Sequence, residues 1–505
     1  MKILFHVLAA AFITMAGLAP AGCLSLGPDY ERPALDIDMP DNFLAAEDSA
    51  TRPYASAGNW WTEFEGARLN RVVAGVIAGN PDIRKAAASV LEARALAGQN
   101  RADRFPELSL EARASRQEQT TADPVTGQNV TVESDSYSLA LPASFELDLW
   151  GRLARASQAA RAELLAAEAN RRTISQSLIA EAVSQYFRVQ SLQGQLDVSR
   201  RLRQTRRENL TMVEARYRRG LATVLDVQQA RRGLARAEAE IPSLVQALGK
   251  ARHALDVLQG AYPGRKEAAP KQTPKQAPEL ATEPATELAP ELTTEQETRL
   301  ALPPPIPAGL PSELLNRRPD IRAAEASLEA ACARIGAAKA NRFPRISLTG
   351  QFGYTSEELD LLLKPESELW RIGAGLFQPL FDAGRRKSAQ RAAEARYQQQ
   401  LAGYAKTVLN ALAEVEDALL TRQQQLARRE RLLKYREQAE ATLATARDRY
   451  QRGLTSYLNV LDAQEANLQA DLDLVKTRHV IYANRVALYR ALGGGWGDEK
   501  RVPEE

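Results

Sequence analysis

The sequence predicts a mainly α-helical chain that is built from two copies of one unit, each with a pair of β-strands. Three observations predict this class: a repeated segment, two very long helix-forming stretches without proline, and two sets of alternating apolar residues. Because the repeated unit takes up about half of the chain, we interpret the 505 residues as one body with internal pseudo-symmetry rather than as several unrelated domains.

The repeat can be read directly from the printed sequence. Residues 81–110 and 319–348 align without a gap at an offset of 238, and 16 of the 30 positions are identical. A second pair of segments, 217–227 and 450–460, aligns at an offset of 233 and carries Arg-Gly-Leu in both copies. An ancient duplication explains both matches.

Alternating apolar residues predict two strands in each copy. The first copy has them at about 107–116 and 136–147, joined by a polar loop at 117–135, and the second at about 345–354 and 369–380. One face of each strand is apolar and the other is polar or small. Two interpretations remain open: a half-buried sheet of a soluble domain, or lipid-facing strands whose other face lines water.

Long helical hairpins are predicted at about 152–258 and 385–492. No proline occurs between Pro142 and Pro242 or between Pro379 and Pro503, and strong helix formers dominate both stretches. A helix of about 65 residues is roughly 100 Å long at 1.5 Å per residue. No globular core has that length, so the helices must pack along each other. Each hairpin turns at Arg-Gly-Leu, where glycine permits the left-handed backbone that ends a helix.

The remaining segments complete the domain organisation. Residues 1–22 form a secretory signal, with Lys2 before an apolar stretch and Pro20-Ala-Gly-Cys23 at its end. It is either an ordinary signal peptide or a bacterial lipoprotein signal that leaves a lipid on Cys23. Five segments follow the signal: an extended arm (23–60), the first repeat (61–262), a Pro-rich low-complexity linker (263–313), the second repeat (314–492) and a tail (493–505).

The composition excludes several function classes. The 66 basic and 63 acidic residues nearly cancel, and no basic block indicates nucleic-acid binding. The chain has three histidines and two cysteines, which are too few and too scattered for a zinc site or a Cys/His catalytic set. No Gly-rich phosphate loop or Ser-His-Asp set occurs. We therefore expect no enzyme activity, no metal and no cofactor beyond the lipid on Cys23.

Several motifs occur together in one order: the lipoprotein leader, Gly27-Pro-Asp-Tyr-Glu-Arg-Pro33, the paired strands, the paired hairpins and the segment 305–321. In this combination the chain resembles the TolC-like outer-membrane factors, and more closely their OprM/NodT-type lipoprotein branch. The resemblance covers residues 23 to about 492, apart from 265–298, which look like an insertion. It implies a homotrimer with a 12-stranded β-barrel, four strands per chain, continued by a 12-helix periplasmic α-barrel. Three chains would also pair the open edges of the sheet, whose free N–H and C=O groups are not tolerated in lipid.

The resemblance implies a function as well. Such a chain is the outer-membrane exit duct of a tripartite efflux or type I-like export system, fed by a periplasmic adaptor and an inner-membrane pump of the RND type. It would be anchored by lipid in the outer membrane of a Gram-negative bacterium and extend into the periplasm. A lipid-anchored coiled-coil spacer or adhesin would account for the helices but not for the strands, and a periplasmic adaptor would lack the duplication.

The resemblance also points to site residues at the hairpin turns. Asp462 falls where the family carries a carboxylate facing the lumen, and Leu458 where the OprM-like branch narrows; a solvated helix residue is the alternative reading of Asp462. Asn459 and Thr455 replace an aspartate and an arginine of the TolC gate, and Asp226 matches a gate partner in the first copy. The expected constriction is Leu458, Asn459, Asp462 and Asp226, and the expected adaptor contacts are Arg219, Gly220, Leu221, Arg452, Gly453, Leu454 and Thr455.

Overall fold

The computed structural model describes residues 25–37, 39–45, 58–64, 66–122, 127, 129–264, 306 and 311–494. The signal, Cys23 and the 265–298 tract lie outside these residues. The chain divides into two compact units. Unit 1 is Met1–Asp36, Ala87–Asn170 and Asp320–Thr407, and unit 2 is Ile37–Ala86, Arg171–Pro319 and Val408–Glu505.

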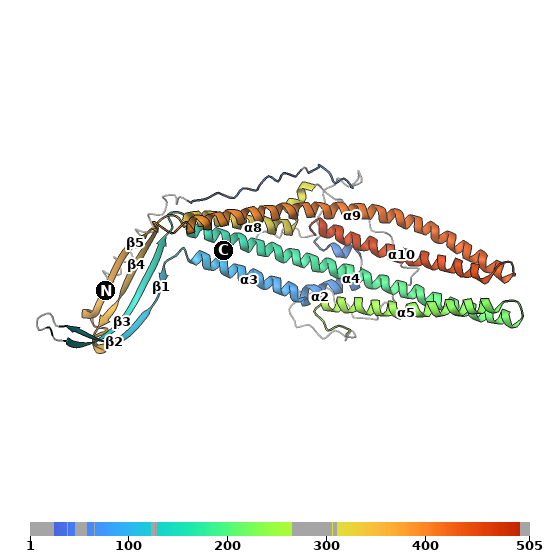
Figure 1. Cartoon of the computed structure of the whole chain (residues 1–505), viewed down its shortest axis with the longest axis horizontal. Coiled ribbons are helices and arrows are strands. Elements are labelled where there is room, and N and C mark those ends of the chain that lie inside the picture. Colours follow the sequence, from blue (N-terminus) through green and yellow to red (C-terminus); the bar gives the residue numbers. More distant parts are fainter. Residues whose placement is uncertain are drawn as a thin grey trace. The chain divides into compact units, whose positions relative to one another are not determined.

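Unit 1 holds one antiparallel sheet (Figure 1). Its strands are β1 (Glu107–Leu108), β2 (Glu111–Ala122), β3 (Asn129–Leu147), β4 (Arg345–Ser356) and β5 (Glu368–Phe377). Both β1 and β2 pair with β3, followed across the sheet by β4 and β5. The gap between β1 and β2 lies opposite Pro142, which has no N–H to donate to the ladder. They are therefore one interrupted strand, and the sheet is four strands wide.

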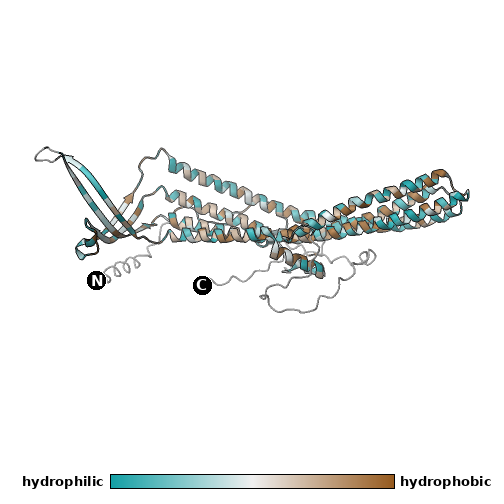
Figure 2. Cartoon of the chain, turned by 90° about the horizontal axis from the view of Figure 1, so that it is seen from below, coloured by the Kyte–Doolittle hydropathy of each residue, from teal (hydrophilic) through white to brown (hydrophobic). Residues whose placement is uncertain are grey.

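The first strand pair is longer than the sequence pattern predicts. Strand β2 continues to Ala122 and β3 begins at Asn129, so most of the expected loop at 117–135 is paired. Polar cross-strand pairs stabilise this extension: the hydroxyls of Thr120 and Thr131 are 3.0 Å apart, and Arg116 forms an ion pair with Glu133. Figure 2 shows that the extension is hydrophilic. Because residues 117–121 of the β2 part are all polar, this part lacks the alternation by which strands are predicted.

The two faces of the sheet differ in chemistry. Register places most of the large apolar side chains on one face, where Leu108 is 68%, Ile372 79% and Leu376 68% exposed. Arg113, Arg371 and several hydroxyls occupy the opposite face. Within the described part of this single chain, nothing covers the apolar face.

The N-terminal arm docks on helix α8 (Pro319–Ala340) through the Gly27–Pro33 motif. Arg32 donates to both carboxylate oxygens of Glu325 at 2.6 Å, and Arg155 of helix α4 (Arg152–Arg218) donates to Asp29 at 2.7 Å. Close packing requires glycine at the crossing: a Cβ on Gly27 would lie 2.4 Å from the Cα of Gly336. The motif is thus a clamp that fixes the arm.

Unit 2 consists of helices around an aromatic core. It contains η2 (Trp60–Phe64), α2 (Ala67–Gly79), α5 (Val224–Leu258), η3 (Pro311–Glu313), α7 (Leu314–Arg317), α10 (Tyr457–Ala491) and parts of α3 (Pro81–Ala102), α4 and α9 (Arg385–Gln451). Trp60 stacks on Tyr489 at 5.0 Å and Phe187 on Tyr482 at 4.7 Å. Buried Arg318 donates to the carbonyl of Ala491 and pairs with Glu414, which anchors the end of α10.

Equal helix lengths reflect the duplication. Helices α4 and α9 have 67 residues each, and α5 and α10 have 35 each. Among the described helices, none is long and apolar enough to cross a membrane.

A side chain at Gly336 should release the arm. In Gly336→Ala the new Cβ would lie 2.7 Å from the carbonyl of Leu26, and overpacking of this kind costs about 1–3 kcal/mol. We expect a lower melting temperature and faster proteolysis of the arm. Exposed Gly403 of α9 has no neighbour within 4 Å, so Gly403→Ala should be neutral or slightly stabilising. Equal effects of both substitutions would contradict the clamp.

Stability of unit 1 should fall as the pH rises above the ordinary carboxyl range. Burial and the neighbouring Glu325 raise the pKa of Glu329 above its ordinary value of 4.5. The folded chain therefore keeps a proton at pH values where the unfolded chain has lost it. Glu329→Gln should raise the melting temperature at pH 7 and flatten its pH dependence. An unchanged pH profile would show that Glu329 titrates normally.

Candidate functional site

Both hairpin turns use the same backbone design. Gly220 (φ 73°) and Gly453 (φ 75°) adopt the left-handed conformation after α4 and α9. The next N–H groups, of Leu221 and Leu454, donate to the carbonyls of Arg216 and Arg449 at 2.9 and 2.8 Å. This Schellman arrangement satisfies helix-end carbonyls and stops the helix at a defined residue.

An apolar cluster beneath the turns joins the two hairpins. Val213 and Val227 come from the first hairpin, and Tyr450, Val460 and fully buried Tyr457 from the second. Arg216 adds a polar connection, because its Nη1 donates to the carbonyl of Gln451 at 3.0 Å and its guanidinium lies 5.0 Å from the ring centre of Tyr450. Burial, and to a lesser degree Asp226, raise the pKa of Tyr450. The two turns therefore form one packed structure.

The two copies differ in how their second helices begin. Thr223 and Asp226 form a reciprocal capping box at the start of α5, with the carboxylate of Asp226 accepting from the Thr223 N–H at 2.9 Å. In the second copy the amide of Asn459 donates to the hydroxyl of Thr455 at 2.5 Å, and the N-cap Ser456 makes no side-chain capping bond. Asp226 thus has a local structural role that Asn459 does not reproduce.

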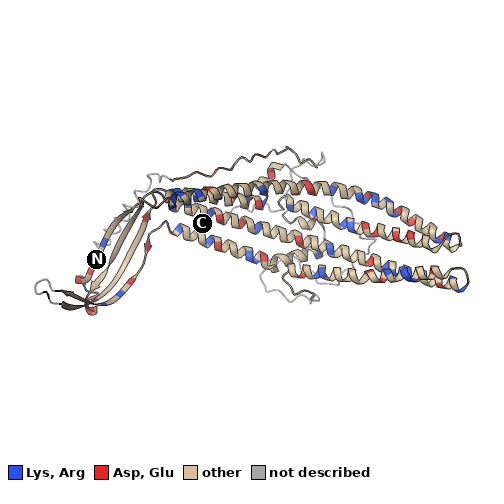
Figure 3. Ribbon diagram, in the orientation of Figure 1, with Lys and Arg blue, Asp and Glu red and all other residues tan. Residues whose placement is uncertain are grey.

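Three of the predicted constriction residues share one exposed side of α10. Leu458, Asn459 and Asp462 are exposed, whereas Tyr457, Val460 and Leu461 beside them are buried against the other helices. The predicted adaptor contacts Arg219–Leu221 and Arg452–Leu454 are exposed in the turns, and Thr455 is half-buried. Figure 3 shows basic residues, coloured blue on the ribbon, near both turns. Asp226 lies at the start of α5, where its carboxylate is engaged in the capping box with Thr223.

Sequence reasoning did not find a buried charged group above the turns. Arg206 of α4 is only 4% exposed, and its Nη2 lies 3.6 Å from Glu465, which also pairs with Arg236 at 3.3 Å. Burial lowers the pKa of Arg206. Helix α4 is rich in arginine, so no pattern distinguishes the buried one.

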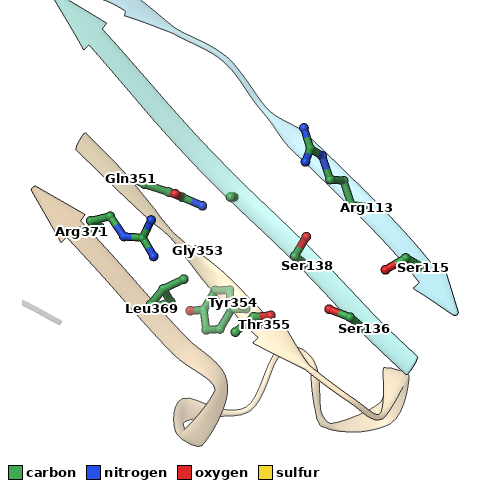
Figure 4. A pocket seen from close by; sticks show the side chains of 11 residues that line it. Arg113, Ser115, Ser136, Ser138, Gln351, Gly353, Tyr354, Thr355, Leu369 and Arg371 are labelled. Atoms are coloured by element: carbon green, nitrogen blue, oxygen red, sulfur yellow. The ribbon is translucent and has the colours of Figure 1, made fainter. Parts of the chain in front are cut away.

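The polar face of the sheet contains a hollow of about 390 Å³ (Figure 4). Arg113 and Arg371 lie on either side of it, with Ser138 and Thr355 between them. Gly353 allows β3 and β4 to approach closely here, since a Cβ would lie 2.2 Å from the carbonyl of Leu139. Hydroxyl and guanidinium groups favour contact with water on this face.

Comparison with known proteins identifies the family. The family model "Outer membrane efflux protein" matches residues 73–261 and 310–494. The chain belongs to this family. It is 35% identical to the cation efflux system protein CusC of Escherichia coli O6:H1, over 95% of this chain and 97% of that protein. It is 32% identical to the probable outer membrane lipoprotein SilC of Salmonella typhimurium, over 94% and 96% of the two chains.

Solved structures agree with this assignment. The outer-membrane channel OprN superposes with a TM-score of 0.80 at 32% identity, covering 94% of this chain and 99% of that one. The protein is therefore an efflux channel component of the outer membrane, and the fold is that of the TolC-like channels with their internal repeat.

Loss of the capping box should loosen the first turn locally. Removing an N-cap interaction costs about 0.5–2 kcal/mol, so Asp226→Ala should speed amide hydrogen exchange across residues 221–230. Asn459→Ala should change exchange across 454–463 much less, because Asn459 caps no backbone group. Equal effects in both turns would contradict the difference between the copies.

Proposed function

We propose that three copies of this chain assemble into the exit duct of a tripartite efflux system. Twelve strands would form a β-barrel in the outer membrane, and twelve long helices would form an α-barrel through the periplasm. A periplasmic adaptor and an inner-membrane pump of the RND type would deliver the cargo. The chain would act as a passive conduit without a catalytic site or cofactor.

The open edges of the sheet carry this proposal. Within the described residues, β5 pairs only with β4, and β2 pairs only with β3. An unpaired edge is not tolerated in lipid, because its N–H and C=O groups would have no hydrogen-bond partner. Four strands are too few to close on themselves, but three chains provide twelve and remove every edge.

The two faces of the sheet fit opposite sides of such a barrel. The exposed apolar side chains of the first face, including Ile372 and Leu376, suit the lipid. The second face, with Arg113, Arg371 and the hollow between them, suits an aqueous lumen. A soluble sheet would instead need a second layer to cover its apolar face.

The hairpin turns fit the narrow end of the duct. Leu458 and Asp462 share one exposed helix side, and Asp226 is engaged in its own cap, so we assign the constriction mainly to α10. Three Asp462 carboxylates near one axis would attract cations and repel one another. The exposed basic turns at Arg219 and Arg452 would contact the adaptor.

A lipid on Cys23 would hold the N-terminus at the membrane. Small residues precede Cys23 in the sequence, and the relative SilC is described as an outer membrane lipoprotein. The clamp of the Gly27–Pro33 motif on α8 would then join this anchor to unit 1.

Conductance of single channels in planar bilayers tests the duct and its constriction. The protein should form pores that prefer cations and conduct less at acidic pH, and Asp462→Ala should reduce the selectivity several-fold. Glu430→Ala, an exposed carboxylate paired with Lys434 on α9, should change neither property. Absence of pores would refute the duct, and unchanged selectivity in Asp462→Ala would refute the carboxylate ring.

Cysteine cross-linking tests the adaptor contact. A cysteine at Leu221 or Leu454 should capture the cognate adaptor in cells. A cysteine at exposed Tyr435, distant in sequence from both turns on α9, should not. Capture from Tyr435 alone would place the adaptor elsewhere.

A further inference from the structure

The hollow on the polar face of the sheet results from a difference in side-chain size between the central and the outer strands. Its middle is formed by short residues of β3 and β4, among them Ala140 opposite Gly353. Long arginine side chains enter from the outer strands, Arg113 from β2 and Arg371 from β5 (Figure 4). The volume of about 390 Å³ lies in the range of small-molecule sites, roughly 300–1,000 Å³.

The two arginines make the hollow positively charged. Neither Asp nor Glu is among the described residues that line it. Within the described part of the chain, Arg371 forms no ion pair, and the ion pair of Arg113 is with neighbouring Glu111 at 3.5 Å. Both side chains of that pair are well exposed, at 78% and 49%, so it holds Arg113 only weakly. Both guanidinium groups are therefore available to an anion.

Hydroxyl groups add further hydrogen-bond donors. Ser138 lies opposite Thr355 between the two arginines, and Ser115 lies opposite Ser136 beside them. Among the described residues, none of these four hydroxyls has a side-chain hydrogen-bond partner, so each can donate to a bound molecule. Guanidinium and hydroxyl donors together suit carboxylates and other oxyanions.

Leu369 distinguishes this hollow from a site for inorganic ions. It lies on the polar side of β5, directly opposite Gly353, and is half-buried. Contact with water alone would favour a polar residue at this place. An apolar side chain beside convergent polar groups is instead typical of sites for organic ligands.

We propose that the hollow binds small organic anions, whose carboxylate or sulfonate groups pair with Arg113 and Arg371 while their apolar body contacts Leu369. All of its lining residues belong to one chain, so the site is complete without assembly. Its place in the wall of an export path rests on the duct proposed above. In that duct it would retain anionic cargo at the outer-membrane end.

The strand register favours a ligand with two anionic groups. Arg113 and Arg371 are three strands apart, or about 14 Å, and their rows meet β4 at Thr355 and Gln351, about 13 Å apart along the strand. At this separation the two side chains can hold opposite ends of one molecule. An aromatic dicarboxylate such as terephthalate is therefore the probe.

Titration of the detergent-solubilised full chain with terephthalate at low ionic strength tests the site. We expect saturable binding of one molecule per chain, no binding of the neutral terephthalamide, and weaker binding of inorganic sulfate. Arg371→Gln and Arg113→Gln should each weaken terephthalate binding about tenfold, because each removes charge-assisted hydrogen bonds. Leu369→Ser should weaken binding of terephthalate but not of sulfate.

Arg116→Gln provides the matched control. Arg116 belongs to the same strand as Arg113 but lies on the opposite face of the sheet, where it pairs with Glu133. Its replacement should leave terephthalate binding unchanged. Equal binding by the parent, Arg371→Gln and Arg113→Gln, or equal binding of terephthalamide, would overturn the site. Sulfate binding as tight as that of terephthalate would overturn the organic ligand.

Planar bilayers separate this proposal from the duct. If pores form, terephthalate should reduce their conductance in the parent and much less in Arg371→Gln. Pores without terephthalate binding in the titration would refute the site and leave the duct intact. Saturable binding by a chain that forms no pores would refute the duct and leave the site intact.

Discussion

Hydrogen bonding of the backbone at the edges of secondary structure is the constraint on which this protein depends. An isolated chain presents two unpaired sheet edges and an uncovered apolar face. Lipid excludes unpaired backbone groups, so in the proposed membrane assembly other copies would have to supply the missing strands. In the proposed assembly the duplication would let one kind of junction close the sheet both within and between chains.

Helix ends obey the same constraint with local means. Both turns use glycine in the left-handed conformation to satisfy helix-end carbonyls, and Thr223 and Asp226 satisfy the first N–H groups of α5. The two copies differ at the start of the second helix of each hairpin, because α5 begins with a capping box and α10 does not. Asn459 stands in place of Asp226, and Asp462 in place of Gln229, so one hairpin has a capped start and the other an exposed carboxylate. The pseudo-symmetry therefore breaks at the turns, where the proposed constriction lies.

The sequence predicts those parts of the fold that depend on local physics. Glycine at 220 and 453 and the absence of proline in α4 and α9 determine where the hairpins turn, and alternation reveals the apolar ends of the strands. Alternation cannot reveal the extension of β2, because residues 117–121 are all polar. Three features depend on contacts distant in sequence: the approach of Gly27 to Gly336, the burial of Arg206 and the pairing of Arg32 with Glu325. Patterns along one helix contain no information about such contacts. For the site, the sequence indicated Leu458 and Asp462 through the resemblance, whereas the capping role of Asp226 needed the geometry.

Amide hydrogen exchange of the protein in lipid vesicles tests the central claim most directly. If other copies complete the sheet, the amides of β2 and β5 should be protected about as strongly as those of β3 and β4. Rapid exchange of the peptides that cover 111–122 and 368–377, alongside strong protection of 345–356, would show that both edges stay open and would contradict the account.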